Sequence, residues 1–445
     1  MNSTTKRLRL TAILASTLAI GLAATGCSSG AGGGTAGSSQ TKGVTITVAW
    51  NNPAPPQATL DAFTKQTGIT VKWTNIDWDS LQTKISAAAT SKTYFADATD
   101  VDWSRVGQLG KLGWFYSMDK FMDTKSLASD MPQLNAFVSG GQVIGIPYDS
   151  SFIVTTVNKA MFAKAGITTM PTTIAEYTKD LRTVQSSGVS KTPLNIPFSA
   201  AEGLSTYWYQ TTAAFGGTIL DGKGKPQFES KDSAGYKAAA WMVDALKTGL
   251  VPQGSINTAD SQGQQTLMAK GTVASTFADY SGNVGSLYDV PASSSVVGQV
   301  QYIPTPGATG IAPNLGNPDG IGIPKEAKYP KAAAEFIKWV TSAQNQADFA
   351  GASGPSKIEP GYFTPSRLSG LALLTSRGKL AQGAILSQLL KDHARPVFPA
   401  GAPTWYPQFS RSVNTELHSA AVGSITVDAA IKAIAAQATT LSNGS

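Results

Sequence analysis

An alternation of strand-like and helix-like segments in the early part of the chain constrains the fold most. VTITVAW (44–50) alternates apolar and polar residues, which is typical of a strand, and ITVKWTNI (69–76) repeats the pattern. Between them, ATLDAFTKQTG (58–68) predicts a short amphipathic helix that Gly68 ends in a left-handed conformation. SLQTKISAAATS (80–91) predicts a second helix. Strand, helix, strand, helix is the order of a parallel α/β sheet.

Three later segments carry clear helix-start signals. In PTTIAEYTKDL, Thr173 and Glu176 form a capping box, in which each side chain accepts from the other's backbone. PKAAAEFIKWV predicts a helix that begins at Pro330, where a missing N–H costs nothing. TVDAAIKAIAAQATTL predicts a helix near the end of the chain, with Thr426 as its cap and Asp428 in its positively polarised first turn.

The length of the folded part predicts more than one domain. About 400 residues follow position 43, and single hydrophobic cores stop growing at roughly 250–300 residues. VIGIPYDSSFIVTTVNK (143–159) predicts one long extended run, broken only at Pro147. No sequence repeat of short period indicates a solenoid.

The only cysteine, Cys27, lies at a boundary that predicts processing rather than packing. Lys6, Arg7 and Arg9 precede an apolar run of signal-peptide length, and small residues stand just before the thiol. This pattern resembles a bacterial lipobox. We therefore expect a signal peptide over 1–26 and a diacylated Cys27 as the mature N-terminus, because two acyl chains anchor a protein stably. An ordinary secreted protein cut nearby is the alternative.

The Gly/Ser-rich segment 27–43 has the composition of a flexible tether, so we expect the folded part to be held at the outer face of the cytoplasmic membrane. Removing 1–26 takes away three positive charges and lowers the formal net charge from +7 to about +4. So mild a charge gives no reason to expect a nucleic-acid partner.

The sequence lacks the motifs of several enzyme classes. It has two histidines and one cysteine, no HExxH, no GxxxxGK[ST] and no GxSxG, so we expect no metal and no cofactor. DATDVDW (97–103) places acids close together but lacks the glycine and distal glutamate of a calcium loop.

Aromatic residues beside polar ones are the positive signal. Nine tryptophans are present, and several stand next to Asp, Asn or Tyr at expected strand ends. A sugar offers an apolar C–H face to an aromatic ring and hydroxyl groups to polar side chains, so such places suit a sugar pocket. The candidate ligand-binding residues are Trp50, Asn51, Asn52, Trp78, Asp102, Trp103, Tyr148, Asp149, Tyr207, Trp208, Tyr209, Asp279, Tyr280, Trp405 and Tyr406.

Taken in order, several stretches resemble the family 1 extracellular solute-binding proteins, the carbohydrate receptors of ABC importers. They are AFTKQTGITV, GQLGKLGWFYSMD, GIPYDSSFIVTTVNK, FGGTIL, IGIPKEAKYPKAAAEFIKWV and RPVFPAGAPTWYPQFSRSVNTEL. The resemblance covers about 44–441 and implies two hinge-linked α/β lobes of the periplasmic-binding-protein type II fold. It implies an N-terminal lobe over 44–154 with 308–345, and a C-terminal lobe over 155–307 with 346–445.

The resemblance also implies roles for particular residues. Trp405 and Tyr406 match an aromatic pair that stacks on sugar in maltose-binding relatives. Trp50 and Asn52 match the end of the first strand, and Trp208 and Tyr209 fall in the corresponding region of the second lobe. Asp279 and Tyr280 stand where the family commonly has Gly-Pro-Trp.

These features lead us to expect a monomeric, non-enzymatic receptor that captures a mono- or oligosaccharide and delivers it to the permease subunits of an ABC importer. One alternative keeps the fold but binds a polyamine or phosphate ester. A polyamine would need several convergent acids, and a phosphate an arginine or a helix start. The other alternative is a secreted glycoside-active enzyme, which needs two carboxylates about 5–10 Å apart; Asp149, Glu202 and Asp279 are its candidates.

Overall fold

The first sheet combines strands from the start of the chain with one that comes much later. The computed structural model describes residues 39–444 apart from 52–53, 260–262, 264 and 351–363. The sheet order is β2-β1-β3-β12-β6, with β1 parallel to β2 and β3, and β12 antiparallel to β3 and β6. The strands are β1 (Val44–Trp50), β2 (Ile69–Asn75), β3 (Ala98–Asp102), β6 (Ile146–Pro147) and β12 (Asp319–Gly322). The predicted parallel α/β start is confirmed.

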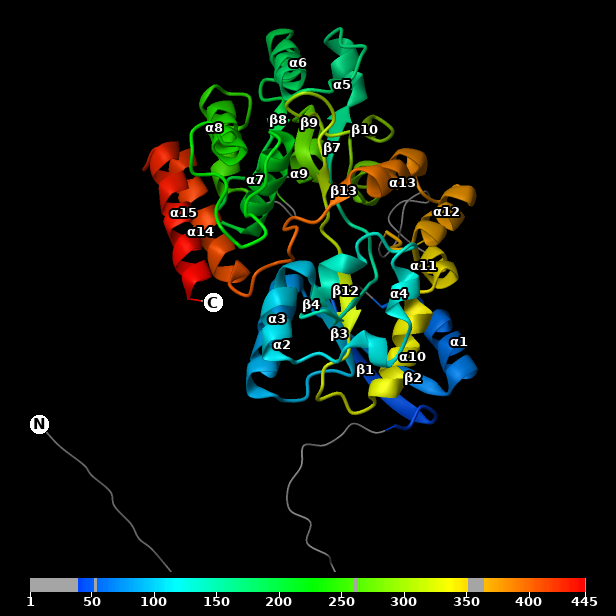
Figure 1. Ribbon diagram of the computed structural model, residues 1–445. Helices are drawn as coiled ribbons and strands as arrows, with labels where there is room; N and C mark the ends of the chain where they lie inside the picture. Colours follow the sequence, from blue (N-terminus) through cyan, green and yellow to red (C-terminus); the bar gives the residue numbers. More distant parts are fainter. Residues whose placement is uncertain (1–38, 52–53, 260–262, 264, 351–363, 445) are drawn as a thin grey trace, which may run out of the picture. The chain divides into compact units, whose positions relative to one another are not determined.

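Helices cover both faces of this sheet (Figure 1). One hydrophobic core joins the sheet to α1 (Gln57–Thr67) and α10 (Pro330–Val340), and another joins it to α2 (Trp78–Ser91) and α3 (Val106–Leu112). Gly68 ends α1 at φ 74°, and Pro330 is the first residue of α10, so both predictions are confirmed.

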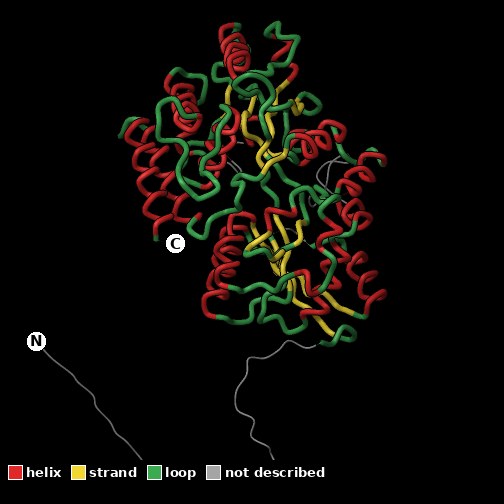
Figure 2. Tube along the Cα trace, in the orientation of Figure 1, coloured by secondary structure: helices red, strands yellow, loops and turns green. Residues whose placement is uncertain are grey.

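The second sheet has the order β10-β7-β9-β8. Its central strand β7 runs antiparallel to both neighbours, and β8 is parallel to β9. The strands are β7 (Ile153–Asn158), β8 (Leu194–Asn195), β9 (Ser275–Tyr280) and β10 (Val300–Ile303). Figure 2 shows the two groups of strands as separate yellow clusters with helices around each.

The extended run expected over 143–159 is interrupted at Pro147, as predicted, but its two parts are not one run. β6 ends at Pro147 and belongs to the first sheet, whereas β7 begins at Ile153 and belongs to the second. The residues between carry the chain from one sheet to the other, and their backbone N–H groups bond outside any strand: Tyr148 N to Asp319 O at 3.0 Å and Ser150 N to Thr364 O at 3.0 Å. Apolar content alone did not reveal this transfer.

The helices around the second sheet form two groups. α6, α7, α8, α14 and α15 share one hydrophobic core, and α9, α11, α12 and α13 share another. In the first group, α7, α8, α14 and α15 pack on one another. Thr173 and Glu176 form the predicted capping box of α6, and Thr426 caps α15, so both predictions are confirmed. The helices here are α5 (Lys159–Lys164), α6 (Ile174–Ser186), α7 (Glu202–Ala214), α8 (Ala234–Lys247), α9 (Gln265–Ala269), α11 (Ala343–Ala350), α12 (Leu368–Ser376), α13 (Gly383–Asp392), α14 (Tyr406–Ala421) and α15 (Val427–Asn443).

Shorter elements complete the chain. They are α4 (Thr124–Leu127), the hairpin β4 (Val138–Ser139) and β5 (Gln142–Val143), the pair β11 (Asn314–Leu315) and β13 (Ala394–Arg395), and the short helices η1 (Trp103–Arg105), η2 (Met118–Lys120), η3 (Leu134–Phe137), η4 (Gln253–Asn257) and η6 (Val284–Tyr288). Among the residues described, no helix has both the length and the apolar character needed to cross a membrane.

The tail segment 396–405, which leads into α14 beside the second sheet, contacts residues that follow β3 of the first sheet. Trp103, which follows β3 of the first sheet, packs at 6.3 Å from Phe398 and 5.5 Å from Tyr406, ring centroid to centroid. Gly107 of α3 lies so close to this tail that a Cβ there would stand 2.1 Å from the carbonyl oxygen of Ala402. The described residues belong to one compact unit, so these contacts are internal to it.

Candidate ligand-binding site

A cavity of about 340 Å³ lies where the ends of β3 and β9, the start of β12 and the first turn of α7 meet. Its size falls within the usual range for small-ligand sites, about 300–1,000 Å³. The lining residues are Trp78, Asp102, Trp103, Ser104, Ala201, Glu202, Thr206, Ala259, Tyr280, Asn317 and Asp319. Aromatic rings and acidic or amide groups therefore share one space, which suits a ligand with both an apolar face and hydroxyl groups.

The residues after β3 are held by Asp102, which is only 5% exposed. Its Oδ1 accepts from the backbone N–H of Ser104 at 2.8 Å and from the Ser104 hydroxyl, which shapes η1. Its Oδ2 accepts from Trp78 Nε1 at 3.1 Å, which fixes one aromatic wall. Trp103 Nε1 donates to Asn317 Oδ1 at 3.0 Å, which fixes another. One carboxylate thus organises two sides of the cavity.

On the opposite side, Glu202 opens α7. Its carboxylate accepts from the Tyr406 hydroxyl and from Ser410 Oγ, the latter at 2.8 Å. Burial raises the pKa of Glu202, and the two hydroxyl donors oppose that rise. The positively polarised start of α7 favours negative charge at this position.

Two further acids lie behind the cavity floor. Asp100 accepts from Gln82 Nε2 at 2.7 Å and from the Tyr148 hydroxyl at 3.3 Å. Asp149 Oδ1 accepts from the backbone N–H of Asp319 at 2.9 Å. Burial, followed by the charge of Asp102, holds the pKa of Asp100 well above its usual range, and burial raises the pKa of Asp149 to about 7.

Basic side chains are scarce in this region. No Lys or Arg belongs to the lining. Arg105 lies beside one of the lining residues, with its Cζ 5.8 Å from the centre of the Trp78 ring. In the described parts of the chain, no group of three or more His, Cys, Asp or Glu residues is arranged to hold a metal ion.

Four of the candidate ligand-binding residues line this cavity, Trp78, Asp102, Trp103 and Tyr280, and so does Glu202, a candidate of the enzyme alternative. A second set lies at the neighbouring strand ends. Trp50 is buried, stacked on Trp73 at 5.0 Å, and Tyr148 contacts its ring at 4.3 Å. Asn51 Oδ1 accepts from the Tyr148 hydroxyl at 3.0 Å. Asn52 and Cys27 lie outside the described residues.

The aromatic triplet of α7 is buried in the second core. Tyr207 donates its hydroxyl to Asn195 O at 3.0 Å, and Trp208 Nε1 donates to Gly235 O at 2.9 Å. Tyr209 packs against Phe398 at 5.8 Å. None of these three side chains is among the residues that line the 340 Å³ cavity.

Asp279 and Tyr280 take different positions although they are neighbours in β9. Asp279 is buried among donors: Thr156 Oγ1 at 2.6 Å, the Tyr288 hydroxyl at 2.8 Å and the Asn283 amide. Burial raises the pKa of Asp279, and these donors oppose the rise. Tyr280 lines the cavity.

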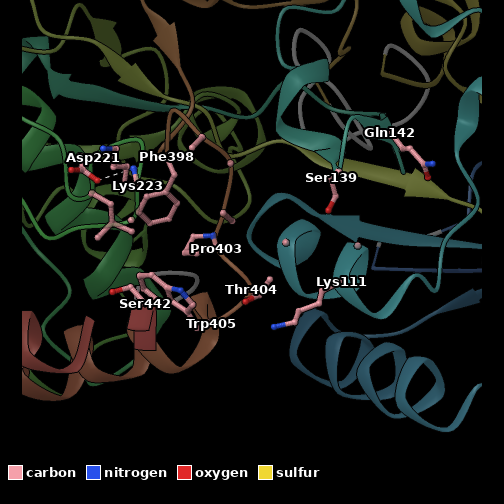
Figure 3. A pocket seen from close by; sticks show the side chains of 18 residues that line it. Lys111, Ser139, Gln142, Asp221, Lys223, Phe398, Pro403, Thr404, Trp405 and Ser442 are labelled. Atoms are coloured by element: carbon pink, nitrogen blue, oxygen red, sulfur yellow. Dashed lines mark hydrogen bonds between the residues drawn. The ribbon is translucent and has the colours of Figure 1, made fainter. Parts of the chain in front are cut away.

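Trp405 and Tyr406, the aromatic pair of the tail, lie at different hollows. Tyr406 is buried and reaches the cavity through its hydrogen bond to Glu202. Trp405 lines a separate hollow of about 590 Å³. Figure 3 shows Lys111, Ser139 and Gln142 on one side of this hollow and Asp221, Lys223, Phe398 and Trp405 on the other.

Sequence reasoning missed several lining residues, above all Ser104, Thr206, Asn317 and Asp319. Asn317 and Asp319 were detectable, because Asn-Pro-Asp-Gly (317–320) is a polar stretch with turn-forming residues at the start of β12. The missing knowledge was that β12 inserts beside β3, which no local pattern predicts.

The comparisons with known proteins agree with this architecture. The family model described as bacterial extracellular solute-binding protein matches residues 44–347, so the chain belongs to that family. The members of this family are binding proteins of ABC transport systems, and the fold is their two-lobed α/β type. No curated protein matches the chain in sequence.

Three solved structures illustrate the likeness. Maltose-bound MalE3 of T. maritima has a TM-score of 0.76 at 19% identity, covering 89% of this chain and 100% of that one. A solute-binding protein of Agrobacterium radiobacter K84 in complex with ribitol has a TM-score of 0.75 at 23% identity, covering 90% and 99%. One from Agrobacterium vitis S4 with bound D-mannitol has a TM-score of 0.73 at 22% identity, covering 90% and 99%.

Proposed function

We propose that this protein is the receptor of an ABC importer and captures a mono- or oligosaccharide, or a related polyol, in the 340 Å³ cavity. The observation that carries this proposal is the combination of three aromatic side chains (Trp78, Trp103 and Tyr280) with acid and amide groups in one cavity. The titles of the similar structures name maltose, ribitol and D-mannitol, which are ligands of that kind.

The lobes that hold the ligand are 44–154 with 308–345 and 155–307 with 346–445. The strands of the two sheets fall in these ranges, except that β7 begins at Ile153. A ligand shifts the equilibrium from open to closed lobes only as far as it binds the closed state more tightly than the open one. Delivery of the ligand to a permease is also part of the proposal, and it is inferred from membership of the family.

The same proposal includes the remaining ligand contacts and the membrane anchor. Trp405 extends the site toward the 590 Å³ hollow when the ligand is longer than the cavity. A diacylated Cys27 and the tether over 27–43 hold a monomeric receptor at the outer face of the cytoplasmic membrane.

One observation favours a second candidate, a basic solute such as a polyamine. Asp102, Glu202 and Asp319 all line the cavity, and no Lys or Arg does. A polyamine would neutralise these carboxylates directly.

A thermal-shift screen of residues 29–445 tests both candidates. The ligands are maltose, ribitol, D-mannitol and further mono- and oligosaccharides, with spermidine as the basic probe. A ligand at 100 times its dissociation constant stabilises the folded state by about 2.7 kcal/mol, which gives a clear rise in melting temperature. A shift with spermidine alone contradicts the saccharide proposal, and release of reducing sugar from an oligosaccharide would show an enzyme.

A further inference from the structure

The register of the first sheet places two carboxyl groups face to face. β12 pairs antiparallel with β3, and Asp319 is the direct partner of Asp102. Side chains directly opposite in such a pair have Cβ atoms about 4.5–5.5 Å apart. Two carboxylates that share so small a space do not both ionise readily. Both line the cavity, so their shared charge is part of the surface that meets the ligand.

The hydrogen bonds of the two carboxyl groups differ, and the difference favours the proton on Asp319. Asp102 accepts from Trp78 Nε1, the Ser104 N–H and the Ser104 hydroxyl, and three donors stabilise an ionised carboxylate. Within the described residues, no N–H and no serine, threonine or tyrosine hydroxyl donates to the Asp319 carboxyl. A carboxyl opposite a negative charge and without donors favours its neutral form.

The groups that face Asp319 from the surrounding elements act in the same direction. Asp100 on β3, Asp149 after β6 and Glu202 on α7 are all acidic, and Arg105 on η1 is the one cation nearby among the described residues. Arg105 forms no ion pair with any of these acids there. The remaining titratable neighbours are the phenols of Tyr148 and Tyr280. Burial first, then the charges of Asp100, Asp149 and Asp102, hold the pKa of Asp319 well above its usual range.

We propose that Asp319 is a neutral carboxylic acid in the working receptor and donates a hydrogen bond to an acceptor oxygen of the bound saccharide. This inference rests on the proposed function. It explains how a cavity lined by three acids takes an uncharged ligand: Asp102 and Glu202 accept from ligand hydroxyls, and Asp319 supplies the complementary donor. Ligand capture is then coupled to the proton on Asp319.

The sign of the coupling follows from the donor role. Raising the pH through the titration of Asp319 in the free protein removes the donor and places a second charge beside Asp102. The dissociation constant therefore rises about tenfold per pH unit above that point, because one proton is linked to binding. Asp319→Asn keeps a donor in nearly the same shape and has no proton to lose.

The test measures dissociation constants by calorimetry from pH 5 to pH 10, with whichever of maltose, ribitol and D-mannitol gives the largest thermal shift. We expect Asp319→Asn to bind within about threefold of wild type at pH 5 and to show a flat pH profile. Glu202→Gln, the matched change on the opposite wall, keeps the wild-type slope. A slope that survives in Asp319→Asn, or disappears in Glu202→Gln, overturns the proposal, as does tighter binding at high pH.

A second measurement stands even if none of these ligands binds. Infrared spectroscopy of the free protein at pH 7 detects the C=O stretch of protonated carboxylic acids. We expect one such band in the difference between the spectra of wild type and Asp319→Asn. The difference between wild type and Glu202→Gln is the control. Absence of that difference band overturns the neutral state of Asp319, whereas a band without saccharide binding contradicts only the proposed function.

Discussion

Trp50 and Trp103 both stand where strands of the first sheet end and both are buried, but only Trp103 also lines the 340 Å³ cavity. Trp50 is the last residue of β1, is 1% exposed, and is enclosed by Trp73 and Tyr148. Trp103 comes one residue after β3, in a single-turn helix that turns its ring toward the cavity and the tail. At Trp103, the single-turn helix that follows β3 directly brings the ring to the cavity.

The largest effect expected from this comparison is on stability. Trp50→Ala removes a ring from the core between β1, β2 and β6, and such truncations cost about 3–5 kcal/mol. We expect the free energy of unfolding, measured with urea, to fall by that amount. Trp103→Ala is the matched variant and should lose clearly less. Equal losses in the two variants would abolish the distinction between core and site.

The next effect is on ligand affinity, which should fall more in Trp103→Ala than in Trp50→Ala. Trp103→Ala should weaken a ligand that fits the cavity by about 2 kcal/mol, or roughly thirtyfold, because truncating a central aromatic contact has this cost. Calorimetry on folded Trp50→Ala should give an affinity close to wild type. Trp405→Ala, which changes the separate hollow, should leave the affinity for a short ligand unchanged and weaken only a longer one. An unchanged affinity in Trp103→Ala would remove that ring from the site.

A smaller effect is expected where the helix after Trp103 meets the tail. Gly107→Ala forces a methyl group against the Ala402 carbonyl, and overpacking costs about 1–3 kcal/mol. Because the two groups fall in different lobes of the proposed division, we expect this cost to oppose lobe closure and to weaken ligand binding about tenfold. Gly254→Ala is the control, since a Cβ there meets open space. Small-angle scattering with ligand present should show a larger radius of gyration in Gly107→Ala alone, and equal radii would refute the coupling.

The smallest effect concerns the acids behind the two strand ends. Asp149 has a pKa of about 7 in the folded protein against 3.8 normally, so folding favours its protonated form. Its contribution to stability is complete below pH 3.8 and is lost as the pH rises toward and through 7. The melting temperature should therefore fall from pH 5 to pH 8, and fall a few degrees less in Asp149→Asn. A steeper fall of the melting temperature in Asp149→Asn than in wild type would contradict the raised pKa of Asp149.

Local patterns predicted the elements well and the site only in part. Gly68, Thr173, Pro330 and Thr426 act within one turn of sequence, so their roles could be read directly. The cavity depends on contacts between residues more than 200 apart, such as Trp103 with Asn317 and Glu202 with Tyr406. Polar and aromatic types indicated the kind of site, but the insertion of β12 beside β3 decided which residues form it.

The hollow of Figure 3 has a practical consequence for watching this receptor at work. Lys111 and Lys223 are exposed on its two sides, and Cys27, the chain's single cysteine, precedes the folded unit. Residues 29–445 therefore contain no native thiol, and cysteines placed at 111 and 223 accept a donor and an acceptor fluorophore with no competing site. Energy transfer between the dyes then turns the receptor into an optical sensor that reports its own ligand in real time.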